Sequence, residues 1–250
     1  MTLKLKRWLE IAKDPYTTDR PISRYLREYP PLNLPFPGYA GDLSEAQANE
    51  NLHYRLDIRF ERLDLLRNLL YHTDPSIVWP DRFTRDNIDP FIIALHQWAG
   101  KQWPALKARI KGDVLSRWRA GERGGECIGL SVVADVSQVL GELILTLRPS
   151  LNWGIDRDPV NIRNGKDTVN RMVLLGDRRG DPGNQIEVDI EAIVLNRFLH
   201  PNAINERLEN SWLRSIHAAI NGGNEGAGAL DDLPTDTHGI PTAEPKITRD

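Results

Sequence analysis

Two acidic residues stand in the most apolar stretch of the chain. Asp135 and Glu142 are the only charged side chains within residues 130–147, and their spacing of seven places them on one face of a helix. Paired carboxylates can act as general acid and base, or can bind a hard metal ion. Carboxylates in apolar surroundings also occur in structural networks. We therefore favour a structural role over a functional one for Asp135 and Glu142, either as a narrow solvated face of the helix or as an ion pair with Arg163 or Arg171.

The single cysteine, Cys127, follows a glycine-rich turn and precedes the same apolar stretch. A helix N-terminus lowers the pKa of a thiol, and this setting is similar to the turn-then-helix cysteine of papain-like and CHAP-type hydrolases. The resemblance implies a nucleophile. Those families place a histidine on a strand after the cysteine, whereas here the later histidines are in or beside predicted helices or in the tail: His200, His217 and His238. We therefore interpret Cys127 as a buried structural residue and keep the nucleophile as the alternative.

A run of basic residues covers positions 101–123, and tryptophans interleave with it at 98, 103 and 118. Basic and aromatic side chains together can contact the phosphates and bases of a nucleic acid. The three tryptophans coincide with the apolar stripe of the predicted helix, so we assign them to the core. Nucleic-acid binding through the 101–123 face stays a further alternative.

The segment after the apolar stretch supplies candidates for partner binding: Trp153, Asp156, Arg163 and Arg171. The chain has no CxxC, no HExxH and no closely spaced pair of histidines, so we predict no metal site. It also has neither a phosphate-binding loop nor a dinucleotide fingerprint. We therefore expect no cofactor.

These residues require a mainly helical body to position them. Apolar residues at three- and four-residue spacing predict a long buried central helix over about 130–147 and flanking helices elsewhere, at 44–72, 89–119 and 203–220. The opposite face of 44–72 carries charges of both signs, among them Arg55 and Arg62, and we interpret it as solvated. Short strands at about 151–156 and 171–177 form a small β element, while 186–199 fits a strand or a helix. The prediction is an α+β fold that is predominantly α-helical.

Residues 1–221 are predicted to form one globular domain. The segment "YPPLNLPFPGYAGD" at 29–42 holds four prolines, so it runs extended, either packed across the body or as a docking arm for a partner. Residues 222–250 carry six acidic and two basic side chains and little apolar surface. Such a composition predicts a disordered acidic tail.

The formal net charge of the 250 residues is −3, which leaves the part before the tail near neutral, with no strong attraction to nucleic acids or anionic membranes. One cysteine excludes an internal disulfide and favours a reducing compartment. The first residues lack the apolar run of a secretory signal, and no stretch approaches the roughly 20 apolar residues of a membrane span. We expect a soluble cytoplasmic protein without membrane contact.

Residues 130–176 are predicted to form four elements in succession: a buried helix that contains "VLGELI", a proline-containing turn, a strand with a tryptophan and a second strand with "VLLG". This layout resembles small bacterial domains, some of which are found beside toxin–immunity systems. A helical body, a proline-rich segment and an acidic tail suit a protein that recognises another macromolecule, and the resemblance adds to this interpretation. We therefore predict a non-enzymatic protein-binding or regulatory role with another protein as partner. A hydrolase that uses Cys127, or the pair Asp135 and Glu142, is the alternative.

Overall fold

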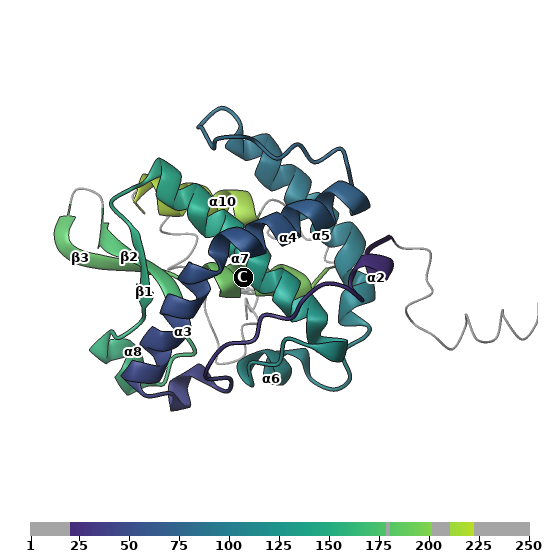
Figure 1. Cartoon of the computed structure of the whole chain (residues 1–250). Helices are drawn as coiled ribbons and strands as arrows, with labels where there is room; N and C mark the ends of the chain where they lie inside the picture. The colour runs from purple at the N-terminus through teal and green to yellow at the C-terminus, as the bar shows by residue number, and fades with distance from the viewer. Residues whose placement is uncertain (1–20, 179–180, 202–210, 223–250) are drawn as a thin grey trace, which may run out of the picture.

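The computed structural model describes residues 21–178, 181–201 and 211–222, which form a mainly helical α+β fold (Figure 1). Its α-helices are α2 (Pro21–Tyr25), α3 (Glu45–Asp57), α4 (Arg59–Thr73), α5 (Ile88–Lys107), α6 (Val114–Arg119), α7 (Ile128–Leu147), α8 (Pro159–Asn164), α9 (Ile190–Leu199) and α10 (Ser211–Asn221). The strands are β1 (Asn152–Ile155), β2 (Met172–Arg178) and β3 (Asp181–Val188), and short 3-10 turns occur at η1 (Ala40–Asp42) and η2 (Gly125–Cys127). The predicted fold class is confirmed.

Helix α7 is the centre of the structure. It packs against α4, α5, α9 and α10, and Figure 1 shows it in the middle of the molecule, with α4, α5 and α10 labelled around it. Its four valine side chains and Leu130, Leu140 and Leu143 are fully buried, as the apolar pattern predicts, while Leu145 and Leu147 near its end are partly buried. Contrary to our expectation, Gly125–Leu147 is long and apolar enough to cross a membrane by length and composition alone, and 89% of its apolar window is buried inside the fold.

The flanking helices differ from their predicted bounds for local reasons. The predicted helix 44–72 is two helices, α3 and α4, which meet at Ile58 (φ −90°, ψ 2°). Ser44 caps α3 in a capping box with Gln47. Helix α5 continues past Pro104 to Lys107, and α6 begins after Asp113, whose side chain accepts a hydrogen bond from the Ser116 amide.

The small β element is an antiparallel sheet of order β1-β2-β3 within the described residues. Leu175 of β2 pairs with Asn152 on one side and Glu187 on the other. The ambiguous segment 186–199 contains both structures: its alternation ends with β3 at Val188, and α9 begins at Ile190 after the capping residue Asp189. We did not predict β3 as a separate strand, because its residues before Ile186 include few apolar side chains.

Some predictions fall on parts of the chain outside the described residues. The predicted helix 203–220 is described from Ser211 onward as α10. Residues 1–20 and the predicted acidic tail beyond Gly222 lie outside the described ranges.

Candidate functional site

Asp135 is buried and paired, but its partner is neither Arg163 nor Arg171. Arg62 of α4 donates to it through Nε at 2.9 Å and through Nη2, and the Tyr29 hydroxyl donates to the same carboxylate. Burial raises the pKa of Tyr29 well above its usual value, so this hydroxyl remains a donor. Asp135 therefore belongs to a structural ion pair, but the predicted cations were wrong, because Arg62 takes the place expected for Arg163 or Arg171.

Glu142 has different neighbours from Asp135. Its Oε1 accepts hydrogen bonds from Gln138 Nε2 at 2.8 Å and from Trp153 Nε1 at 3.0 Å. The Trp153 ring lies on Gly141, where a Cβ atom would be 2.0 Å from it, so Trp153 joins the sheet to α7. Residues seven apart on a helix are about 10 Å apart along its axis. The two acids do not converge on one cleft.

Cys127 precedes α7, yet its surroundings are the opposite of those of a nucleophile. The side chain is buried, and its thiol contacts Glu122 Oε2 at 3.7 Å. Burial, followed by the negative charge of Glu122, raises the pKa of Cys127 to about 11. The thiol is therefore held neutral at physiological pH.

The proline-rich segment packs across the body. We call residues 29–43 the strap. The Leu32 amide donates to Ser131 Oγ at 2.9 Å on α7, and the backbone of Phe36 exchanges two hydrogen bonds with the Asn51 side chain on α3. At its end, the Leu43 carbonyl accepts a hydrogen bond from Asn170 Nδ2 at 2.8 Å. The strap is therefore fixed to three separate parts of the fold.

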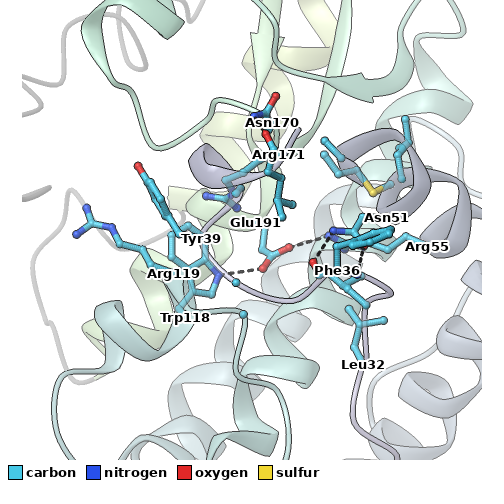
Figure 2. Close-up of a pocket in the computed structure, with 18 of the residues that line it drawn as sticks. Leu32, Phe36, Tyr39, Asn51, Arg55, Trp118, Arg119, Asn170, Arg171 and Glu191 are labelled. Carbon is cyan, nitrogen blue, oxygen red and sulfur yellow. Dashed lines mark hydrogen bonds and ion pairs between the residues drawn. The ribbon is translucent and has the colours of Figure 1, made fainter. Parts of the chain in front are cut away.

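A cavity of about 80 Å³ lies under the strap. Figure 2 shows its wall, with Asn51 and Arg55 on one side of Glu191 and Tyr39 and Arg119 on the other. Its apolar lining comes from the strap, α3 and β2: Leu32, Leu34, Phe36, Leu43, Leu52 and Met172. The charged lining comes from α3, the end of α6 and the turn after it, the loop between α8 and β2, and α9: Arg55, Arg119, Arg123, Asp167, Arg171 and Glu191.

Glu191 is the buried anion of this wall. Its carboxylate accepts hydrogen bonds from Arg55 Nη1 at 2.8 Å, Arg123 Nη2 at 2.9 Å and Trp118 Nε1 at 2.9 Å. Burial alone would raise the pKa of Glu191, but the charges of Arg55 and Arg123 outweigh it and hold the pKa well below its usual range. Glu191 is therefore a permanent carboxylate and no proton donor.

Arg171, one of the predicted binding residues, also lines the cavity. Its guanidinium makes two contacts with the Asp189 carboxylate, at 2.9 and 3.1 Å, and lies 3.9 Å from the centre of the Trp118 ring. A guanidinium over an indole face is held by cation–π attraction. Its orientation is thus set from two directions.

Positive charge exceeds negative charge in this wall. The described lining residues include four arginines and two acids. The Arg123 side chain is only 9% exposed, and its Nε has no hydrogen-bond partner. Burial lowers the pKa of Arg123, Glu191 opposes this effect, and the nearby charges of Arg55 and Arg171 add to it. A buried guanidinium among other cations is a site that attracts an anion.

The rim of the cavity is formed by a polar group of three residues. Arg119 Nη2 donates to Asp167, and the Tyr39 hydroxyl donates to the other oxygen of Asp167 at 3.3 Å. The side chains of Arg119 and Asp167 are 33% and 41% exposed. Solvent therefore reaches this end of the cavity, while Glu191 lies at its buried end.

Of the other predicted candidates, Asp156 and Arg163 lie apart from the cavity, whereas the end of the basic run lines it through Trp118, Arg119 and Arg123. Asp156 is buried in the segment between β1 and β2, and Arg163 is exposed on α8. In the basic run, Trp98, Trp103 and Trp118 are buried, as expected. Several of its cations have protein partners: Arg117 pairs with Glu122 and Glu126, Arg119 with Asp167 and Arg123 with Glu191.

Sequence reasoning did not select Arg55 or Glu191, and it included Arg123 only as the last residue of the basic run 101–123. It assigned Arg55, with Arg62, to a solvated face, whereas both side chains turn inward to carboxylates. Among the described residues, no group of three or more His, Cys, Asp or Glu side chains could hold a metal ion. Comparison with known protein families, curated proteins and solved structures finds no match to this chain.

Proposed function

We propose that the protein is a binding protein and that the cavity under the strap binds a small carboxylate. The observation that carries the proposal is the excess of arginine over acid in the cavity wall, with Arg123 buried and its Nε unpartnered. A buried cation that lacks full compensation costs free energy. An anion that enters the cavity removes part of that cost, and guanidinium groups match a carboxylate in shape.

The charge and size of the site indicate the class of anion. Asp189, behind the wall, pairs with Arg171, so the cluster of four arginines and three acids has one positive charge in excess. A monoanion compensates it. A cavity of about 80 Å³ has room for roughly five to eight water-sized groups, so it fits a carboxylate with a short alkyl group. The leucine, phenylalanine and methionine side chains of the lining suit that alkyl part.

A carboxylate with a short alkyl group can come from two sources. One is a free acid, and the other is the C-terminal carboxylate of a protein that ends in an aliphatic residue. The second source agrees with the protein partner that the sequence analysis predicts. The two sources are separated by the probes used in the test.

Isothermal titration with 3-methylbutanoate and with its uncharged amide tests the proposal. We expect a Kd of about 1 mM or tighter for the acid and binding at least about tenfold weaker for the amide, because one charged hydrogen-bonded contact is lost. Equal binding of acid and amide, or no binding of the acid, would overturn the proposal. The peptide N-acetyl-Gly-Leu and its C-terminal amide form the second pair; tighter binding of this peptide acid than of 3-methylbutanoate identifies a protein terminus as the source.

The hydrolase alternative loses support from the same geometry. A nucleophilic cysteine needs an accessible thiolate, whereas the buried thiol of Cys127 has a pKa raised to about 11 by burial and by the charge of Glu122. Asp135 is fully engaged by Arg62 and Tyr29. Neither predicted catalytic group lines the cavity under the strap.

A further inference from the structure

The segment from Asp156 to Arg171, here called the clasp loop, is closed by the backbone of its first residue. The Asp156 amide donates to the Arg171 carbonyl at 3.1 Å, and the Asn170 amide donates to the Asp156 carbonyl at 3.0 Å. The clasp loop supplies Asp167, Asn170 and Arg171 to the cavity wall. Whatever fixes the clasp loop also fixes this part of the wall.

The Asp156 side chain organises the interior of the clasp loop. It is 1% exposed. Its Oδ1 accepts a hydrogen bond from the Asp158 amide at 2.9 Å, and its Oδ2 accepts from Asn161 Nδ2 at 3.0 Å and from Thr168 Oγ1 at 2.5 Å. One carboxylate thus holds the beginning, the helix α8 and the end of the loop together.

A second carboxyl group joins this cluster from the sheet. Asn161 Nδ2 also donates to Glu187 Oε2 of β3 at 2.7 Å. Burial, followed by the negative charge of Asp156, raises the pKa of Glu187 to about 7. Asp189, which is itself paired with Arg171, acts in the same direction, and Thr168 opposes the rise through a hydrogen bond.

We propose that Asp156 and Glu187 form a proton-controlled clasp: a proton on the Glu187 carboxyl group keeps the clasp loop against β3, and release of that proton to solvent loosens the loop. Two ionised carboxylates in a buried cluster repel each other. The proton removes this repulsion while Asn161 bridges the pair. The effect on ligand binding rests on the proposed function, whereas the clasp itself does not.

The direction of the pH effect follows from the raised pKa of Glu187. Between its ordinary value of 4.5 and about 7, the folded state retains a proton that the unfolded state has lost. The contribution of the clasp to stability is therefore complete below about pH 4.5 and is lost as the pH rises through about 7. The loop should be tight in mildly acidic solution and loose in alkaline solution.

Hydrogen–deuterium exchange of peptides covering residues 156–171 tests the clasp without any ligand. After correction for the intrinsic pH dependence of exchange, we expect protection in the wild type to fall about tenfold between pH 5.5 and 8.5. Glu187→Gln should remove this dependence, because its amide does not titrate. Glu142→Gln, the same change on α7, should retain it.

Two results would overturn the clasp: equal protection of the wild-type loop at both pH values, or a pH dependence that persists in Glu187→Gln. The wild-type comparison decides the matter even where the variant fails to fold. Titration with 3-methylbutanoate at the same two pH values separates the two proposals. If exchange of the loop depends on pH but 3-methylbutanoate binds at neither pH, the clasp is supported and the proposed function is refuted. If 3-methylbutanoate binds but exchange of the loop does not depend on pH, the proposed function is supported and the clasp is refuted.

Discussion

Glu191 and Arg123 form an ion pair at 2.9 Å in which the two side chains are only 7% and 9% exposed. Arg55 completes the group from another helix, at 2.8 Å from the second carboxylate oxygen. Because one carboxylate serves two guanidinium groups, the pair does not neutralise its own surroundings. This relationship makes the cavity under the strap attractive to a further anion.

Glu191→Gln should be strongly destabilising. The change leaves Arg55 and Arg123 without their shared carboxylate in a buried place, and removal of one partner of a buried ion pair costs about 3 kcal/mol or more. Urea denaturation measures the loss in the free energy of unfolding. Glu142→Gln, in a half-exposed position, should lose much less, and equal losses in the two variants would contradict the importance of the buried cluster.

Asp167→Asn should tighten the binding of 3-methylbutanoate. Asp167 already occupies Arg119 and Tyr39 at the rim, so it competes with an entering carboxylate. We expect a Kd lower by about three- to tenfold, the effect of removing one partly screened like charge. Asp64→Asn, on the exposed face of α4, is the control and should leave the Kd unchanged; weaker binding by Asp167→Asn would show that the rim attracts no anion.

Gly121→Ala should displace the strap. Gly121 has a φ of +73°, and a Cβ atom there would lie 2.9 Å from the Gly38 amide nitrogen of the strap. Gly112 has a similar φ of +81° with nothing within 4 Å of its added Cβ, so Gly112→Ala isolates the conformational cost of about 1 kcal/mol. Gly121→Ala should lower the melting temperature further and weaken 3-methylbutanoate binding. Identical behaviour of the two variants would mean that the strap yields freely.

Cys127 should react slowly with thiol reagents in the native protein. Its pKa is raised to about 11, and the side chain is buried, so neither thiolate nor access is available near pH 7.5. Iodoacetamide labelling followed by mass spectrometry should show reaction only after denaturation. Cys127→Ala should retain 3-methylbutanoate binding; rapid native labelling at neutral pH would restore the nucleophile interpretation.

The sequence predicts the core more fully than the site. The apolar pattern of residues 130–147 predicts the buried helix α7, and the cost of burying a charge predicts that Asp135 needs a partner. The sequence pattern does not predict which residue is the partner of Asp135. Arg62 belongs to a helix face with charges of both signs, and only tertiary packing decides which of those side chains turns inward.

The same reasoning could have found Glu191. It stands in the apolar run "IEAIVL" at 190–195, where an acid signals a buried pair just as Asp135 does in α7. The cavity itself had no such signal. Its wall combines residues from the strap, α3, the end of α6, the clasp loop and α9, and their meeting depends on long-range contacts that local patterns do not encode.

A crystal structure of the protein grown with 3-methylbutanoate tests the central claim most directly. We expect density for the acid in the cavity under the strap, with its carboxylate about 2.7–3.2 Å from a guanidinium nitrogen of Arg119 or Arg123 and its alkyl group against Leu34, Phe36 or Met172. A cavity that contains only water at saturating 3-methylbutanoate would contradict the account.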